Sequence, residues 1–116
     1  MERILSEAKD LINSTMNIKY IGYILTNKHN KVLYTGQTDN IGRRMLEHQT
    51  KLYNGFTKRY YADKLVYYEE HNIESDAIAR EKQIKGWIRQ KKLDLINSFN
   101  PGWVDLTNIV FQKETD

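Results

Sequence analysis

The feature that most restricts the fold of this chain is a pair of short runs rich in aromatic and β-branched residues. The first run is residues 20–25 (Tyr-Ile-Gly-Tyr-Ile-Leu) and the second is residues 32–36 (Val-Leu-Tyr-Thr-Gly), with a polar segment at residues 26–31 between them. Such residues favour extended backbone, and two runs joined by a short polar segment are typical of a β-hairpin. We therefore expect two antiparallel strands here.

The two strands of this hairpin each carry a tyrosine on the face that we expect to be shared. Side chains alternate between the faces of a strand, so Tyr34 and Gly36 point the same way. A register that matches this face with that of Tyr23 sets the two tyrosines side by side, each with a phenolic donor and acceptor. Gly36, at the end of its strand, leaves room for a ligand or for another group's backbone.

The residues before the hairpin are expected to form a short amphipathic helix. Apolar residues recur there at the spacing of one helix face: Ile4, Leu5, Ala8, Leu11 and Ile12. Such a helix most simply packs on the domain. A helix that binds a protein partner is an alternative without specific support from the residues. We assign residues 1–17 to this N-terminal extension.

A second helix is expected to begin near Ile41, directly after the hairpin. The candidates for its N-cap are Thr38, Asp39 and Asn40, each with a side-chain oxygen for the free backbone amides. Ile41 and Met45 are four residues apart and should face the core. Arg44 and His48 are also four apart and border that apolar stripe, a placement that suits a cation and an imidazole lining a cleft.

Residues 51–63 are expected to form mostly loop that ends in a short helical turn. Lys58 and Arg59 stand there beside Tyr60 and Tyr61. Basic residues next to aromatic ones can hold phosphates and stack bases. Half-buried tyrosines that only pack on the domain are an equally good interpretation.

A third strand is predicted at residues 65–69, with Leu65 and Tyr67 on one face and Val66 and Tyr68 on the other. We expect the helix after it to begin at an N-cap, Ser75, with Asp76 in its first turn.

That helix contains a carboxylate on its inward face. The positions predicted to face inward are Ala77, Glu81, Ile84 and Ile88. A carboxylate facing a core is costly unless it is partnered or serves a function, which makes Glu81 a candidate site residue. Gly86 is expected to interrupt the helix.

The last predicted helix is residues 89–98, and Asn-Pro-Gly at 100–102 ends it because proline cannot continue a helix. Residues 107–116 are predicted as a C-terminal tail that follows a segment folded back through Trp103 and Val104. The fold class is therefore α+β: a small, mainly antiparallel three-stranded sheet surrounded by helices, with the main domain at residues 18–106.

Composition narrows the class of protein. The chain has 116 residues, enough for one domain with a modest core, and no cysteine, so disulfides, thiolate zinc sites and thiol nucleophiles are excluded. No apolar run approaches the roughly 20 residues of a membrane span, and the charged N-terminus is not a secretory signal. We expect a cytoplasmic protein with no membrane partner.

The charge of the chain is unevenly distributed. The net charge is only +3, but residues 80–92 contain six basic residues and one acidic residue, a local charge of +5. Such a patch can follow a phosphate backbone, and a solvated helix face is the alternative.

The tyrosine pair, Arg44, His48 and Glu81 are parts suited to phosphodiester hydrolysis. A guanidinium can fork onto phosphate oxygens and stabilise charge in the transition state. One carboxylate can hold Mg²⁺ or Mn²⁺, with water and phosphate oxygen as the other ligands. A phenol or imidazole can take a proton from water, although a phenol with its usual pKa of about 10 needs help from a cation, a metal or a relay.

The order of these motifs resembles that of GIY-YIG endonuclease domains, in particular the small stand-alone branch. Ile21-Gly22-Tyr23 and Tyr34-Thr35-Gly36 resemble the two signature motifs. The continuation has the family's order: residues 36–44 with His48, then 56–58, 65–69 and 80–85. The resemblance covers residues 19–106.

The resemblance implies a role for each candidate residue. Tyr23 and Tyr34 match the two motif tyrosines, one of which activates or orients the attacking water. Arg44 matches the catalytic arginine and Glu81 the metal-binding glutamate. His48 stands where relatives carry histidine or tyrosine, which assists proton transfer or phosphate contact.

Gly36 matches the closing glycine of the second motif. Two other positions depart from the family's pattern. Gln37 stands where members from nucleotide excision repair have lysine, which the small branch often lacks. The first motif reads Ile-Gly-Tyr instead of Gly-Ile-Tyr but keeps the tyrosine. The residues expected to contact substrate are Gly36, Thr38, Lys58, Arg59 and Lys85.

The sequence thus predicts an endonuclease that hydrolyses DNA with one Mg²⁺ or Mn²⁺ ion. Two other classes stay open: a nucleic-acid-binding module that does not cut, and a structural protein that recruits a partner. The substrate form, whether single-stranded, duplex or branched DNA, or RNA, is also open. A protein partner is conceivable but has no support in the residues.

Overall fold

The structure is a computed structural model that describes residues 19–50 and 55–115. Its centre is a three-stranded antiparallel sheet of β1 (Tyr20–Thr26), β2 (Leu33–Thr38) and β3 (Lys64–His71), in the order β2-β1-β3. The predicted hairpin and the predicted α+β class are confirmed. The N-terminal helix predicted for residues 1–17 lies outside the described residues.

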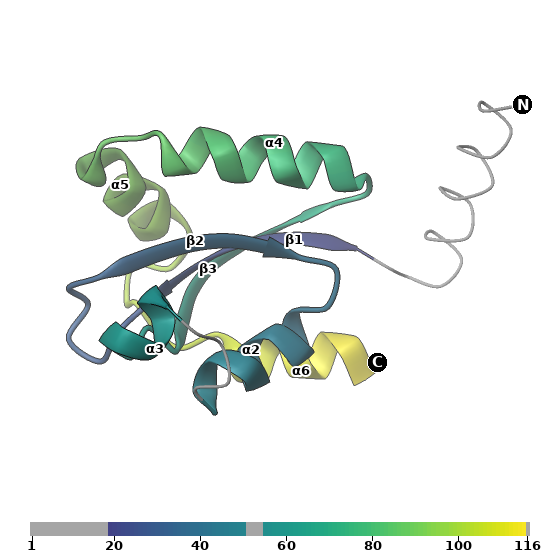
Figure 1. The fold of residues 1–116 in the computed structure, drawn as a ribbon, viewed down its shortest axis with the longest axis horizontal. Helices are drawn as coiled ribbons and strands as arrows, with labels where there is room; N and C mark the ends of the chain where they lie inside the picture. The colour runs from purple at the N-terminus through teal and green to yellow at the C-terminus, as the bar shows by residue number, and fades with distance from the viewer. Residues whose placement is uncertain (1–18, 51–54, 116) are drawn as a thin grey trace, which may run out of the picture.

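Helices cover both faces of this sheet (Figure 1). One face carries α2 (Ile41–Gln49) and α6 (Thr107–Thr115), and the opposite face carries α4 (Glu74–Lys85) and α5 (Arg89–Phe99). The short α3 (Phe56–Tyr60) leads into β3 on the side of α2. Within the described part of the chain, no helix has the length and apolar character to cross a membrane.

Polar side chains fix the turn of the hairpin and the start of α2. The Asn27 side chain accepts hydrogen bonds from the backbone amides of Lys31 at 2.8 Å and Val32 at 3.4 Å, which closes the turn. Asn40 is the N-cap of α2, and its side-chain oxygen accepts from the amide of Arg43 at 3.0 Å. An N-cap of this kind satisfies an amide that has no partner within the helix.

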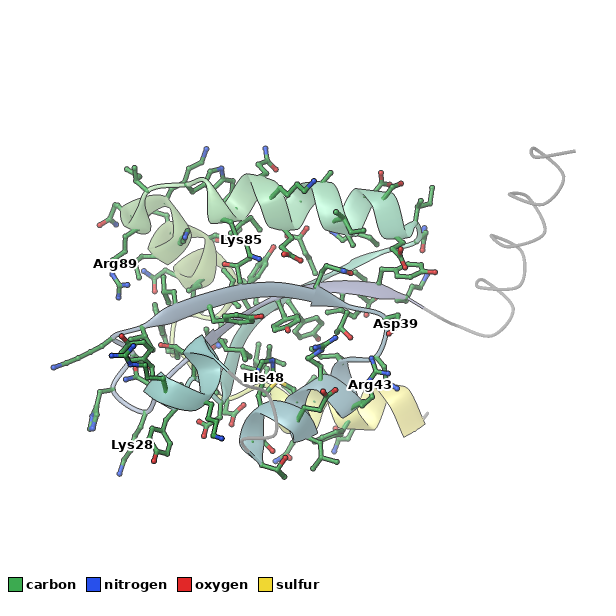
Figure 2. All side chains as sticks on the ribbon, viewed as in Figure 1. Lys28, Asp39, Arg43, His48, Lys85 and Arg89 are labelled. Carbon is green, nitrogen blue, oxygen red and sulfur yellow. The ribbon has the colours of Figure 1, made fainter. Side chains whose placement is uncertain are left out.

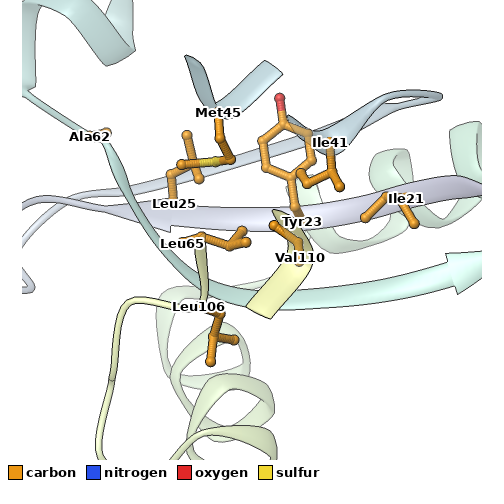
Figure 3. Close-up of a cluster of buried hydrophobic side chains, with 9 residues drawn as sticks. All are labelled: Ile21, Tyr23, Leu25, Ile41, Met45, Ala62, Leu65, Leu106 and Val110. Atoms are coloured by element: carbon orange, nitrogen blue, oxygen red, sulfur yellow. The ribbon is translucent and has the colours of Figure 1, made fainter. Parts of the chain in front are cut away.

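The face toward α2 and α6 holds the larger apolar cluster (Figure 3). Its buried members are Ile21, Tyr23, Leu25, Ile41, Met45, Ala62, Leu65, Leu106 and Val110. Figure 3 shows Tyr23 standing up from β1 beside Ile41, with its phenolic oxygen pointing away from Val110. The predicted inward positions of α2, Ile41 and Met45, are therefore confirmed.

The face toward α4 and α5 holds a second, smaller cluster. Its buried members are Ile24, Val66, Tyr67, Ile84 and Ile96. Asn100, the C-cap of α5, fastens this layer to the sheet. Its side-chain amide donates to the carbonyl oxygens of Val66 at 3.1 Å and Val104 at 2.8 Å, and its side-chain oxygen accepts from the Val104 amide at 3.1 Å.

The predicted faces of β3 are wrong because the pairing of β1 with β3 contains an irregularity. Leu25 pairs with Leu65, but the preceding Ile24 pairs with Tyr67, so one extra residue of β3 stands between these pairs. Such a bulge shifts the alternation of side chains. Leu65 and Tyr68 consequently pack on the side of α2, and Val66 and Tyr67 on the side of α4.

Both ends of α4 differ from the prediction. The N-cap is Ile73, which makes no side-chain cap bond, so Ser75 lies inside the first turn. Asp76 is in the first turn, as predicted. The helix ends at Lys85 with Gly86 as C-cap, and Ile88, predicted to face inward, is 75% exposed at the start of α5.

The segment predicted as a C-terminal tail instead contains α6. Leu106 and Val110 are buried against β3 and α2, and the Leu106 amide donates to the carbonyl oxygen of Leu65 at 2.8 Å. Val104, predicted to anchor the fold-back, is 60% exposed. Trp103, the other residue predicted for the fold-back, packs against the second apolar cluster as predicted, and Leu106 adds a further anchor.

Replacing the buried Asn100 tests the fastening of α5 to the sheet. Asn100→Ala leaves the carbonyl oxygens of Val66 and Val104 without its amide, so the free energy of unfolding should fall by about 1–3 kcal/mol. Urea unfolding measures this loss. The exposed Asn108→Ala should change stability by less than about 0.5 kcal/mol. Equal losses in both variants would contradict this role of Asn100.

Candidate active site

Tyr23 lies across the outer strand of the sheet, in the space that Gly36 leaves free. The two residues are partners in the register of β1 and β2. A Cβ atom built on Gly36 would stand 2.5 Å from the Tyr23 phenolic oxygen and 2.6 Å from Cζ. Only glycine allows this contact. Because β2 is an edge strand, the phenol that lies across it ends at the edge of the sheet.

His48 and Tyr34 complete a cluster with Tyr23. The Tyr23 phenolic oxygen is 3.3 Å from His48 Nε2. The tyrosine rings are 6.3 Å apart, and the imidazole meets both edge-on, at 6.0 Å from Tyr23 and 5.6 Å from Tyr34. The predicted pairing of the tyrosines is thus present. His48 is only 1% exposed, deeper than the bordering position predicted for it.

Arg44 is one helical turn before His48 on α2 and is half-buried, with its Nε atom buried. Its neighbour Arg43 points away from the protein, where it pairs with Asp39 and Glu47 at 3.4 Å and keeps 55% of its side chain exposed. Residues four apart share a helix face, so Arg44 and His48 lie on the same side of α2. Of two adjacent arginines, the structure directs only Arg44 inward.

Thr38 serves the turn between β2 and α2. It is 3% exposed, and its hydroxyl accepts from the amide of Asn40 at 3.1 Å and donates to the carbonyl oxygen of the same residue at 3.3 Å. These bonds hold the N-cap of α2 in place. The predicted contact of Thr38 with substrate stays a prediction.

Glu81 comes from the opposite face of the sheet. It is on α4, its side chain is 21% exposed, and it accepts a hydrogen bond from Lys85 Nζ at 2.6 Å. Figure 2 labels Lys85 between α4 and the sheet and His48 between the sheet and α2. The five predicted catalytic residues therefore divide between two faces, with β2 between the two groups.

The predicted substrate contacts Lys58 and Arg59 are exposed on α3. The Arg59 guanidinium stands over the Tyr60 ring at 5.5 Å. Tyr60 is 42% and Tyr61 64% exposed, which favours the surface interpretation of these tyrosines over half-buried packing. Tyr61 also has a φ of 54°, an unfavourable value for a bulky residue.

A charged network on the side of α4 was not predicted from the sequence. Both carboxylate oxygens of Glu69 accept from Arg80 Nε, at 3.1 and 3.2 Å, and the carboxylate also bonds the Tyr67 hydroxyl and His71 Nε2, the latter at 2.7 Å. Burial favours the neutral carboxyl, but the bonds from Tyr67, His71 and Arg80 outweigh it and lower the pKa of Glu69. Burial raises the pKa of the Tyr67 hydroxyl to about 12, and the hydrogen bond to Glu69 and its negative charge add to this rise.

The glycine of the first motif lies beside this network. Gly22 pairs with Glu69 across β1 and β3, and a Cβ on Gly22 would lie 3.4 Å from Glu69 Cγ. Glu69 and Arg80 are in different elements, so no local spacing joins them. The local signal is the spacing of two residues along β3, which puts Tyr67, Glu69 and His71 on one face of the strand.

The candidate metal ligand was tested against the residues present. In the described part of the chain, no three His, Cys, Asp or Glu side chains gather in a group that could hold a metal ion. One carboxylate with water and phosphate oxygen is the arrangement that Mg²⁺ accepts, and the partly exposed Glu81 fits it. Glu69 fits less well than Glu81, because the Tyr67 hydroxyl, His71 Nε2 and Arg80 Nε already bond its carboxylate oxygens.

Comparison with known proteins gives one family. Residues 12–94 match the model of the GIY-YIG catalytic domain. A UPF0213 protein of Staphylococcus haemolyticus is 38% identical over 78 residues, which are 67% of this chain and 94% of the relative. One of Syntrophus aciditrophicus is 43% identical over 72 residues, 61% of this chain and 82% of the relative.

The fold is also similar to a solved structure. The solution NMR structure of a UPF0213 protein of Bacillus halodurans superposes with a TM-score of 0.50 and 24% sequence identity, covering 78% of this chain and 95% of the other. None of these three names states an activity. The relatives identify family and fold, and the chemistry rests on the residues of this chain.

Adding a methyl group at Gly36 tests the contact with Tyr23. Gly36→Ala should displace the phenol from His48 and lower the free energy of unfolding by about 1–3 kcal/mol. The NMR signals of the Tyr23 ring and urea unfolding report both effects. Gly22→Ala is the matched control, since its methyl would meet only the Glu69 side chain, with Cγ at the ordinary van der Waals distance of 3.4 Å. Unchanged Tyr23 signals in Gly36→Ala would refute the close contact.

The lowered pKa of Glu69 predicts a dependence of stability on pH. A carboxylate with a lowered folded pKa stabilises the protein fully above its ordinary value of 4.5 and loses this contribution as the pH falls below it. The stability difference between wild type and Glu69→Gln should therefore shrink between about pH 6 and pH 3. Urea unfolding across this range measures it. A constant difference would show that the ionised Glu69 is not favoured by folding.

Proposed function

Because the chain belongs to the GIY-YIG family, we propose that it is an endonuclease that hydrolyses DNA phosphodiester bonds with one Mg²⁺ or Mn²⁺ ion. The observation that carries the proposal is the cluster of Tyr23, Tyr34 and His48 against Gly36, with Arg44 on the same helix face as the histidine. Membership of this family makes a nucleic acid the expected substrate class.

The tyrosine and the histidine supply a path for a proton. A neutral imidazole can accept a proton at Nε2, and the Tyr23 hydroxyl is 3.3 Å from that atom. Tyr23 takes the proton of the attacking water as its own proton moves to His48. Both side chains are buried, and few solvent dipoles compete with this transfer. Tyr34 packs against the imidazole and holds its ring plane.

Arg44 supplies the stabilising charge. A guanidinium presents paired donors to phosphate oxygens, and a half-buried one acts in surroundings where charge is poorly screened. Its position beside His48 on α2 directs it to the same phosphate that the water attacks. Arg43, which pairs with surface carboxylates, has no part in this role.

Glu81 is the residue that would hold the metal ion. Once bound, the ion would act as a Lewis acid on a phosphate oxygen. Glu81 needs to release Lys85, whose ammonium group is 2.6 Å away, to take this role. The released Lys85 can then pair with the phosphate backbone, which is the contact predicted for it.

Exposed cations extend the candidate site. Lys58 and Arg59 on α3 and Lys82 on α4 are exposed, and such groups favour a polyanion without selecting a sequence. We infer that binding follows the phosphate backbone and the shape of the DNA. The lack of cysteine suits a reducing compartment, so we place the protein in the cytoplasm.

Cleavage of labelled single-stranded, duplex and branched DNA with Mg²⁺ or Mn²⁺ tests the proposal. Arg44→Ala and Glu81→Gln should each lower the rate by about 10²–10³, since each removes charge stabilisation from the transition state. Arg43→Ala, on the same helix, and Glu74→Gln, on α4, are matched controls with wild-type rates. EDTA should abolish cleavage.

The outcomes separate the candidate functions. A wild type that binds these DNAs in a salt-sensitive way but never cuts them would favour a binding module over an enzyme. A protein that neither binds nor cuts would leave the structural interpretation. Cleavage that persists in Glu81→Gln would remove Glu81 from the metal site.

A further inference from the structure

Arg80 is the most heavily bonded side chain of α4. Its Nε atom donates to both carboxylate oxygens of Glu69, its Nη1 atom donates to Gln83 at 2.7 Å, and its guanidinium stands 5.1 Å from the centre of the Trp87 ring. Its side chain is 28% and that of Glu69 19% exposed, so the pair is poorly screened by water.

Glu69 is itself fixed on three sides. The Tyr67 hydroxyl and His71 bond the carboxylate from the same strand, and the side chain occupies the space above Gly22 on the neighbouring strand. The carboxylate therefore has one position relative to the sheet. A helix residue bonded to it takes its position from the sheet as well.

Little else restrains the rotation of α4 about its axis. Its buried residues are Ala77 and Ile84, which form a single narrow line, and its N-cap makes no side-chain bond. Such a narrow apolar line holds a helix at a set distance from the sheet but restrains its rotation about its own axis less. The link between Arg80 and Glu69 is the polar restraint that the described contacts provide.

Arg80 and Glu81 flank this apolar line on opposite sides. At 3.6 residues per turn, Arg80 and Glu81 each lie about 50° from the line through Ala77 and Ile84, on opposite sides of it. Arg80 reaches β3, and the strand order is β2-β1-β3. Glu81 therefore faces the β2 side, where the Tyr23 phenol lies across Gly36.

From this geometry we propose that Glu69 and Arg80 are positioning residues: their ion pair sets the rotation of α4 and holds Glu81 at the β2 edge of the sheet. This inference rests on the proposed function, because it gives Glu81 the metal as its task. It explains why the network lies on the face away from the tyrosines. It orients the one catalytic residue that the hairpin and α2 do not carry.

Metal binding measured without DNA tests this role. Free Mn²⁺ is followed by electron paramagnetic resonance in titrations of wild type, Glu69→Gln, Arg80→Gln and Glu81→Gln, and cleavage rates are measured against Mg²⁺ concentration. Loss of the ion pair should raise the Mn²⁺ dissociation constant and the Mg²⁺ concentration for half-maximal rate about 10-fold. The KM for DNA should stay unchanged.

Matched variants separate positioning from charge and from folding. Arg89→Gln removes the same charge from α5, where Arg89 donates to the carbonyl oxygen of Lys31, and should leave metal binding unchanged. Arg80→Lys keeps the positive charge but lacks the planar guanidinium with its several donors, and it should recover part of the Mn²⁺ affinity. Because Glu69 and Arg80 act together, the double variant Glu69→Gln/Arg80→Gln should be no worse than either single change.

Three results decide between the claims. Wild-type Mn²⁺ affinity in both Arg80→Gln and Arg80→Lys would overturn the positioning role and leave the nuclease proposal intact. A wild type that binds no Mn²⁺ would overturn it too. A wild type that binds Mn²⁺ through Glu81 but cuts no DNA would end the nuclease proposal, and the Mn²⁺ affinities would still decide the positioning role.

Discussion

The contact between the Tyr23 phenol and Gly36 is the constraint on which the arrangement of the site depends. It requires the hairpin register that makes these two residues partners, because a shift by one residue would turn Tyr23 to the other face. It also requires a glycine, since any side chain at position 36 would occupy the place of the phenol. The two motifs of the family thus form one structural unit: the tyrosine of the first fills the space left by the glycine of the second.

The sheet then divides the molecule into two layers with separate cores. The α2 layer holds the tyrosines, His48 and the apolar cluster around Met45, and its burial makes the site rigid. The α4 layer holds Glu81 and the network around Glu69. A single active site that uses both layers must lie where they meet, at the edge formed by β2.

The sequence was sufficient wherever local pattern determines structure. The aromatic runs predicted the hairpin, and spacing of four residues predicted the inward side of α2 and the placement of Arg44 beside His48. The predictions from sequence failed where contacts between segments distant in the chain determine the structure. The extra residue in the pairing of β1 with β3 separates Tyr67 from the face of Leu65 and places it, with Glu69 two residues further on, on the side of α4, where Arg80 meets the carboxylate.

Two further misses have the same physical origin. The last helix is predicted as a tail because its apolar residues, Ile109, Val110 and Phe111, are adjacent and show no helical spacing, although Val110 and Phe111 pack on the core. Arg80 and Glu69 lie in different elements and carry opposite charges, a combination common on any surface. The sequence shows that Arg80 precedes Glu81, but only the fold shows that Arg80 and Glu69 form a half-buried pair.

A double-mutant cycle on kcat/KM for DNA cleavage with Tyr23→Phe and Glu81→Gln tests directly whether both layers form one active site. The two residues lie on opposite faces of the sheet, so their coupling reports whether both layers serve one reaction. The account predicts strong non-additivity, with the double variant about as slow as the slower single variant. Independent, multiplying losses would contradict a single site at the β2 edge.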